Sequence, residues 1–145
     1  MQIRSIKSNE YDQLLGLMRQ LNPLDQEASE IQFHAFNEII NSKYLDLIVA
    51  EDGGVLLGSC YINVIPNITR GGRPYALIEN VVTDSAHRNR GIGKSLLDHA
   101  VELAWSQNCY KVMLMSGRAE TAVHAFYKKC GFNADEKQAY IQRAP

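Results

Sequence analysis

The sequence predicts a mixed α/β (α+β) fold, with a mostly antiparallel central sheet flanked by about four helices. Two observations predict this class. Three strand-like segments follow one another between residues 45 and 83 with loops suited to hairpins, which favours an antiparallel meander. An amphipathic helical pattern then separates the third segment from a further strand, which favours a parallel crossover. A length of 145 residues suits a single domain, 1–145.

The first half of the chain carries the patterns of a strand, two helices and a hairpin. Apolar residues at three- and four-residue spacing predict the helices, and Asn9 or Asp12 is expected to cap the first. The expected elements are a strand at Ile3–Lys7, a helix that includes Leu14 to Leu21, a break at Asn22–Asp25, a helix at Ser29–Asn41, and strands at Leu45–Ala50 and Val55–Ile65 joined by a hairpin turn at Glu51–Gly54.

The second half begins with a polar, glycine-rich loop and continues as strands and helices in turn. The expected elements are the loop Pro66–Pro74, a strand at Ala76–Thr83, a helix from about Gly91 to Gln107, a strand at Lys111–Met115, a helix at Glu120–Lys129 and a closing strand at Gln138–Gln142.

Composition and charge exclude several functions. A net charge of −1 with 21% charged residues lacks the basic character that binds nucleic acid. The odd number of cysteines, Cys60, Cys109 and Cys130, without metal-ligand spacing, favours reduced thiols and no metal. The N-terminus does not resemble a signal peptide, and no apolar run is long enough to span a membrane. We therefore expect a cytoplasmic protein with no membrane or nucleic-acid partner.

The most informative stretch is the connection that follows the predicted strand Ala76–Thr83. It ends in a turn bracketed by two glycines, and the turn leads directly into a helical pattern. The first N–H groups of a helix lack intrahelical partners and carry partial positive charge, and glycine lets an anion approach them closely. The segment is therefore a candidate phosphate site, and its residues are Arg88, Asn89, Arg90, Gly91, Ile92, Gly93, Lys94 and Ser95.

Two common nucleotide-binding motifs do not fit this turn. A P-loop requires a glycine five positions before Gly93, where this chain has Arg88. The dinucleotide fingerprint requires its third glycine at the position of Leu96. The turn is therefore not predicted to bind a nucleotide in either of these ways.

A third signature does fit. Arg88-Asn89-Arg90-Gly91-Ile92-Gly93 resembles the Arg/Gln-x-x-Gly-x-Gly/Ala signature of the GNAT superfamily of N-acetyltransferases, in which this loop holds the pyrophosphate of acetyl-coenzyme A (acetyl-CoA). Phe126-Tyr127-Lys128-Lys129-Cys130-Gly131-Phe132 resembles the second coenzyme-contacting segment of the same family. Locally, Ile78–Val82 and Cys109–Val112 are most similar to glucosamine-6-phosphate N-acetyltransferases. The resemblance implies the GNAT fold, acetyl-CoA as cofactor and a homodimer.

Acetyl transfer to an amine requires a base, and Glu79 is the predicted one. A carboxylate inside an otherwise apolar strand is costly unless it has a partner or a function, and the resemblance places an acidic residue there. The alternative is that Glu79 points to solvent from one face of the strand. Backbone N–H groups of Val81, Val82 and Thr83 are expected to hold the thioester oxygen and the pantetheine, which a bulge in the strand would permit.

The departing thiolate requires an acid, and Tyr127 is the predicted one. A phenol, with a pKa of ~10, is protonated at neutral pH, and the resemblance also places this tyrosine against the coenzyme. The alternative is a core tyrosine that packs beside Phe126 and Phe132.

The identity of the acceptor is less determined. Arg70, Arg73 and Arg118 are candidate partners for an anionic group on the acceptor, or else solvated loop residues. The connection Met115–Thr121 is longer than the acidic connection of glucosamine-6-phosphate enzymes. We predict acetyl transfer to a primary amine of a small molecule, for which an amino sugar phosphate or another anionic amine is a candidate. The alternatives are acetylation of a protein lysine or N-terminus, and a non-catalytic acyl-CoA sensor, which would need neither Glu79 nor Tyr127.

Overall fold

The computed structural model describes residues 1–24 and 28–145, so Asp25 of the predicted break lies outside the described residues. Two compact units make up the chain, Met1–Met113 and Leu114–Pro145. None of the helices among the described residues has both the length and the apolar character needed to cross a bilayer.

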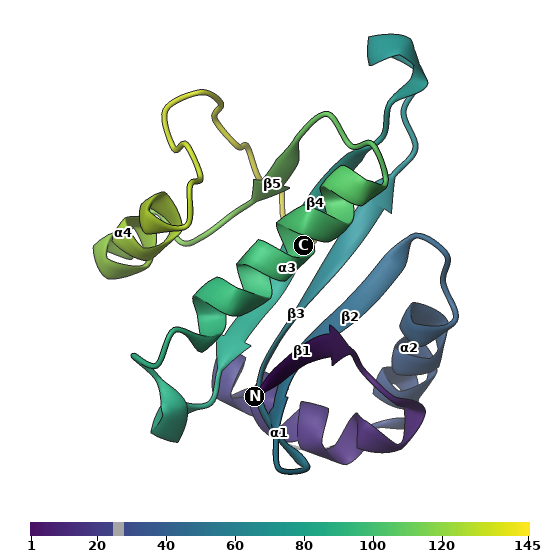
Figure 1. Cartoon of the computed structure of the whole chain (residues 1–145), viewed down its shortest axis with the longest axis vertical. Coiled ribbons are helices and arrows are strands. Elements are labelled where there is room, and N and C mark those ends of the chain that lie inside the picture. The colour runs from purple at the N-terminus through teal and green to yellow at the C-terminus, as the bar shows by residue number, and fades with distance from the viewer. Residues whose placement is uncertain (25–27) are drawn as a thin grey trace. The chain divides into compact units, whose positions relative to one another are not determined.

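The described residues form a five-stranded sheet in the order β1-β2-β3-β4-β5, shown in Figure 1. The first four strands are β1 (Gln2–Ser5), β2 (Leu45–Asp52), β3 (Val55–Ile65) and β4 (Tyr75–Thr83), and each pairs antiparallel with the next. The chain approaches β5 (Val112–Leu114) parallel to β4, because Ala76 N–H donates to Lys111 and Tyr110 N–H donates to Pro74. The predicted mixed, mostly antiparallel sheet is confirmed.

Local sequence explains the strand boundaries. The turn between β2 and β3 consists of Gly53 and Gly54, whose φ angles of 57° and 86° fit glycine best. This turn brings Asp52 opposite Val55 and confirms the predicted hairpin, with β2 extending two residues further than expected. The loop before β4 contains one short 3-10 turn, Arg70–Gly72, and is otherwise irregular as predicted.

Helices cover both faces of this sheet. α1 (Tyr11–Leu21) follows a 3-10 turn at Ser8–Glu10, and α2 (Glu30–Ile40) begins at a capping box formed by Ser29 and Gln32. Together with strand side chains they enclose a core of Leu14, Leu17, Phe36, Leu47, Val49, Leu56 and Val82. Because neighbouring strand residues point to opposite faces, buried Ile48 and Ala50 belong to the other face.

α3 (Ile92–Ser106) packs on that other face and contacts β1 to β4. Its buried residues, Ile92, Leu96, Leu97, Ala100 and Ala104, recur at helical spacing, as the sequence predicts. Cys60 of β3 lies against α3, with its Sγ 4.0 Å from the carbonyl oxygen of Leu96. Burial raises the pKa of the Cys60 thiol to about 12, so this cysteine is a core residue rather than a nucleophile.

The unit Leu114–Pro145 contains α4 (Thr121–Lys129) and irregular segments. The helix ends before Gly131, whose φ of 89° suits a left-handed turn. The predicted closing strand Gln138–Gln142 is wrong, because the structure has no strand there. The β-type side chains Tyr140 and Ile141 are 88% and 66% exposed, so burial does not stabilise an extended conformation.

Candidate functional site

A β-bulge interrupts β4 beside Glu79. In the β3–β4 ladder Tyr61 pairs with Glu79 and Ser59 pairs with Val82, so β4 has one residue more than β3 between these pairs. Asn80 absorbs the extra residue with a φ of 51°. A bulge leaves backbone groups out of the ladder and changes the direction of side chains. The bulge that the predicted role of Val81–Thr83 requires is therefore present.

The bulge also determines which face of the sheet Glu79 occupies. Val82 belongs to the core beneath α1 and α2. Side chains alternate between the two faces of a regular strand, so without the extra residue Glu79, three positions before Val82, would point to the other face. With the bulge, Glu79 lies on the α1 and α2 side, as Tyr61 does. The acidic side chain is thus turned toward the helices that cover this face.

Glu79 is half-buried, and among the described residues none forms a hydrogen bond or ion pair with its carboxylate. Burial, and to a smaller degree the negative charge of Glu79, raises the pKa of the Tyr61 phenol. The two side chains therefore lie within electrostatic reach of each other. A half-buried carboxylate without a protein partner is available to a ligand group or to water.

The second half of β4 lies beyond the reach of β5. Tyr110 N–H donates to Pro74 and Ala76 N–H donates to Lys111, so the chain just before β5 lies beside the start of β4, and β5 ends at Leu114 after three residues. The bulge and the residues Val81, Val82 and Thr83 come later along β4. The edge of β4 that carries the predicted thioester contacts therefore continues past the short β5.

The predicted phosphate site forms a turn that leads directly into α3 without a side-chain cap. Asn89 and Gly91 have φ angles of 62° and 80°, which direct the chain into α3. Gly91 is the residue before α3 and provides no side-chain cap. The first intrahelical bond here runs from Ser95 N–H to Gly91, so the N–H groups of Ile92 and Gly93 have no intrahelical acceptor. Lys94 forms an ion pair with Asp98 at 2.6 Å.

Two residues that sequence reasoning missed hold the start of this turn. Gln20 of α1 donates through Nε2 to Asp84 Oδ2 and accepts from Ser85 N–H, both at 2.8 Å. Asp84 also contacts Nδ1 of His87 at 2.9 Å and accepts from Ala86 N–H. These bonds lower the pKa of the Asp84 carboxyl, and the bond from Gln20 has the largest effect. The Asp-Ser pair after the strand is a recognisable capping signal, but no local signal points to Gln20.

Gly58 was also missed, and it determines how closely β3 and β4 approach beside the bulge. A Cβ atom there would lie 2.8 Å from the Val82 carbonyl oxygen and 3.1 Å from Cδ1 of Leu96. The φ of Gly58 is not unusual, so the need for glycine arises from packing alone. Only the paired register reveals this requirement.

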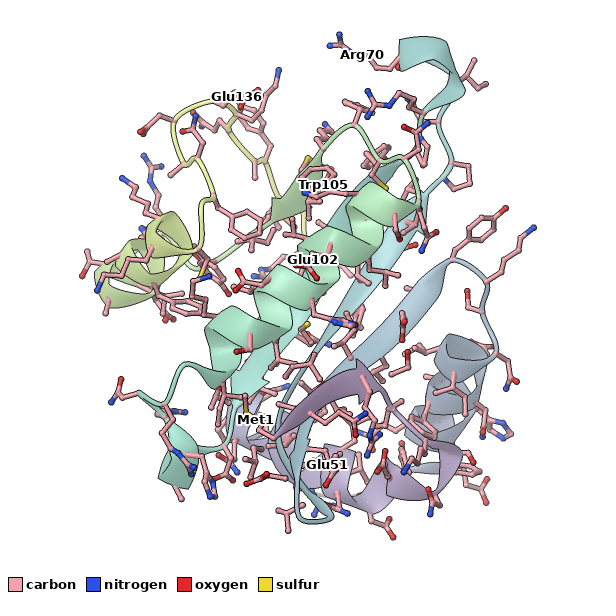
Figure 2. The ribbon with its side chains drawn as sticks, viewed as in Figure 1. Met1, Glu51, Arg70, Glu102, Trp105 and Glu136 are labelled. Carbon is pink, nitrogen blue, oxygen red and sulfur yellow. The ribbon has the colours of Figure 1, made fainter. Side chains whose placement is uncertain are left out.

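The structure does not bring Arg70 and Arg73 to Glu79. Both precede β4, whereas the phosphate turn follows it, and Glu79 lies six positions after Arg73 along a mostly extended chain, a separation of ~20 Å. Figure 2 shows Arg70 projecting from the end of its loop, where its guanidinium lies over the Tyr110 ring. Arg73 donates to the carbonyl oxygens of Asn108 and Cys109 at 3.2 and 3.0 Å.

Tyr127 and Arg118 belong to the unit Leu114–Pro145. Tyr127 is half-buried and packs against Phe126 and Phe132, with ring centroids 5.3 and 6.2 Å apart. Arg118 is exposed, and His124 Nε2 lies 2.8 Å from the carbonyl oxygen of neighbouring Gly117. Glu79, Val81–Thr83 and the turn 88–95, in contrast, form one continuous strand-turn-helix segment.

In this mixed sheet a bulged strand leads through a glycine turn into a helix without a side-chain cap. This arrangement is the one expected of the N-acetyltransferase fold that the sequence resembles. Residues 11–132 match the sequence model of the Acetyltransferase (GNAT) family. The chain belongs to this family, whose acetyltransferases use acetyl-CoA as donor.

Similar proteins agree with this assignment. The chain is 41% identical over 85 residues to a glucosamine 6-phosphate N-acetyltransferase of Trypanosoma brucei brucei, which covers 59% of this chain and 56% of that protein. It is 33% identical over 123 residues to glucosamine 6-phosphate N-acetyltransferase 1 of Oryza sativa subsp. japonica, with 81% and 72% covered. The aligned part thus spans little more than half of the first of these relatives.

A solved structure, a putative acetyltransferase from Agrobacterium tumefaciens str. C58, has a TM-score of 0.93 and 39% identity, with 99% of this chain and 100% of that chain covered. The predicted fold class is therefore confirmed over the chain.

Proposed function

We propose that this chain transfers the acetyl group of acetyl-CoA to a primary amine of a small molecule by direct attack. The observation that carries the proposal is the half-buried Glu79 carboxylate, which has no partner among the described residues and stands beside the bulge of β4. The same strand continues into the turn whose sequence matches the coenzyme loop of the family.

The residues of the turn fit the pyrophosphate of the donor. The N–H groups of Ile92 and Gly93, in the first turn of α3, have no intrahelical acceptor, and the helix dipole adds partial positive charge at that end. Exposed Arg88 and Arg90 add cationic groups nearby in the sequence. Acetyl-CoA would supply the activated acyl group, and the edge of β4 at Val81–Thr83 would bind its pantetheine.

Glu79 would accept the proton that the acceptor ammonium must lose. The neutral nitrogen would then attack the thioester carbon, and backbone N–H groups of the bulge would hold the oxyanion. Collapse of this tetrahedral species breaks the carbon–sulfur bond and forms the amide, and the second proton that the nitrogen then loses would restore the phenol of the acid that protonates the thiolate. Tyr127 would give its phenolic proton to the thiolate, a role supported by the family segment that Phe126–Phe132 matches.

The names of the relatives make glucosamine 6-phosphate the first acceptor to assay. Its phosphate needs cationic partners; of the three candidates that the sequence offers, Arg70 and Arg73 lie away from Glu79, so Arg118 is the remaining one. We also propose the cytoplasmic homodimer that the family resemblance implies. Light scattering of the purified protein tests the dimer, since a monomer has a mass of 16.3 kDa.

Calorimetric titration with acetyl-CoA, followed by thiol release with a panel of amines, tests the proposed function. We expect micromolar binding of the coenzyme and continuous turnover of one amine. Coenzyme binding without turnover of any small amine would favour the protein acetyltransferase or the sensor. Absence of coenzyme binding would overturn the assignment of the turn.

A further inference from the structure

A cavity of about 280 Å³ lies within the unit Met1–Met113, between α1, α2 and the sheet. It holds the volume of about nine water molecules at ~30 Å³ each. Its walls include Tyr11 and Met18 of α1, Ala35 and Phe36 of α2, Tyr61 of β3 and Asn80 of β4. The cavity is thus large enough for the body of a small molecule.

The cavity reaches the predicted catalytic strand. Asn80, one of its walls, is the residue that forms the bulge, and Tyr61, another wall, is the register partner of Glu79. Glu79 lies on the same face of the sheet as the cavity. An amine whose body occupies this cavity would therefore carry its amino group close to the proposed base.

The chemistry of the walls limits what that body can be. No Lys, Arg, His, Asp or Glu is among the described residues that line the cavity, and most of its lining side chains are aliphatic or aromatic. Burial of a phosphate or carboxylate without a cationic partner is costly, so a doubly charged sugar phosphate is poorly matched to these walls. An uncharged, largely apolar body is well matched.

One polar atom in this region lacks a partner. The hydroxyl of Tyr11 is buried and has no hydrogen-bond partner among the described residues, and burial raises its pKa. An unsatisfied buried hydroxyl destabilises its surroundings until water or a ligand group reaches it. A single hydroxyl on an otherwise apolar ligand would provide such a group.

We propose that the acceptor is a primary amine with an uncharged, mainly apolar body, such as an arylalkylamine, and that this cavity binds the body. The inference rests on the proposed function, because it names the acceptor of the same reaction. The base, the thioester and the leaving thiolate keep the roles described above.

Binding and turnover test the inference separately. The probes are 2-phenylethylamine and its hydroxylated analogue tyramine, with glucosamine 6-phosphate as the comparison. We expect both arylalkylamines to bind the protein alone in a calorimeter, and to be acetylated with a higher kcat/KM than glucosamine 6-phosphate. Tyramine should bind more tightly than 2-phenylethylamine, and Tyr11→Phe should remove that difference.

A matched pair of variants on α2 assigns the site. Ala35 is exposed at the cavity wall, and Ala35→Trp should fill the cavity and raise the Kd of 2-phenylethylamine at least about tenfold. His34→Trp, which adds a similar ring at an exposed neighbour outside the walls, should leave that Kd unchanged. Ala35→Leu provides the same test with a smaller side chain if the tryptophan variant does not fold.

The inference is overturned if glucosamine 6-phosphate is the better acceptor, if neither arylalkylamine binds, or if Ala35→Trp and Ala35→Leu both bind 2-phenylethylamine as the unmodified chain does. Binding of acetyl-CoA to the unmodified chain, measured in the same series, distinguishes failure of the proposed function from failure of this inference. Absence of acetyl-CoA binding would overturn the proposed function, whereas coenzyme binding without arylalkylamine binding would overturn this inference alone.

Discussion

Gln20 and Asp84 are 64 residues apart in the sequence, yet Gln20 Nε2 donates to Asp84 Oδ2 at 2.8 Å. Gln20 Oε1 also accepts from Ser85 N–H, so one amide holds both residues that open the proposed coenzyme turn. α1 therefore fixes the start of the turn through two direct hydrogen bonds. A turn held in this way binds an anion with less loss of conformational entropy.

Gln20→Ala should weaken both the fold and coenzyme binding. The loss of two exposed hydrogen bonds should lower the free energy of unfolding by ~1 kcal/mol. The freed turn should raise the Kd of acetyl-CoA about three- to tenfold, because its ordering then accompanies binding. Urea unfolding and calorimetry measure the two effects.

Gln13→Ala is the matched control for this change. Gln13 also lies on α1, donates to Gly54 at 3.1 Å and accepts from Leu56 N–H at 2.9 Å, but it holds the β2–β3 hairpin. It should lower stability to a similar degree with no change in the Kd of acetyl-CoA. Equal effects of the two variants on that Kd would contradict the role of Gln20.

Gly58→Ala should destabilise the chain by ~1–3 kcal/mol, because its new Cβ would lie 2.8 Å from the Val82 carbonyl oxygen. Gly16→Ala is the opposite case: nothing lies within 4 Å of a Cβ on this α1 residue, so the change should stabilise the helix by ~0.5–1 kcal/mol. Thermal unfolding measures the stability of both variants. A Gly58→Ala protein as stable as the unmodified chain would contradict the packing constraint at this position.

Glu10 links stability to acid pH. Arg4 donates to its two oxygens at 2.6 and 2.9 Å, and this bond is the main cause that lowers the pKa of Glu10 below its usual 4.5. Because the pKa of Glu10 is lower in the folded than in the unfolded chain, its contact with Arg4 stabilises the fold above pH ~4.5. This stabilisation is lost as the pH falls through the folded-state pKa of Glu10. Glu10→Gln should therefore be less stable than the unmodified chain at pH 7, and the difference should shrink toward pH 3.

Urea unfolding at several pH values measures this difference. Glu38→Gln, a substitution at an exposed position of α2, serves as the control and should change stability little at any pH. A Glu10→Gln deficit that stayed constant from pH 7 to pH 3 would contradict the linkage.

Gly93→Asp should abolish coenzyme binding without unfolding the chain. A carboxylate in the first turn of α3 interacts favourably with the helix dipole, but it would occupy the place of the pyrophosphate and repel it. Gly71→Asp places the same charge in the loop before β4 and should bind acetyl-CoA normally. Retained micromolar affinity in Gly93→Asp, measured by calorimetry, would contradict the assignment of the turn.

Local patterns sufficed for most of the fold. The strand Val55–Ile65 and the helix of the coenzyme turn were predicted nearly to the residue, because alternation, a two-glycine turn and helical spacing are signals within a short window. The strand Gln138–Gln142 failed for the complementary reason: β-type residues make a strand only where a partner and burial exist.

The parts of the site that sequence could not predict depend on register and on distant contacts. The bulge at Asn80 exists only relative to β3, and the requirement for Gly58 follows from the Val82 carbonyl across the ladder. The Gln20 contact joins segments 64 residues apart. Glu79 could be proposed from sequence because a single carboxylate stands out in an apolar strand.

Glu79→Gln tests the central claim most directly, with kcat and the Kd of acetyl-CoA measured on the same preparation. Exposed Glu102 of α3, labelled in Figure 2, provides the matched control Glu102→Gln. We predict that Glu79→Gln lowers kcat by ~10²–10⁴-fold with an unchanged Kd of acetyl-CoA, because only proton removal from the acceptor is lost. Turnover within ~threefold of the unmodified chain would contradict the assignment of Glu79 as the base.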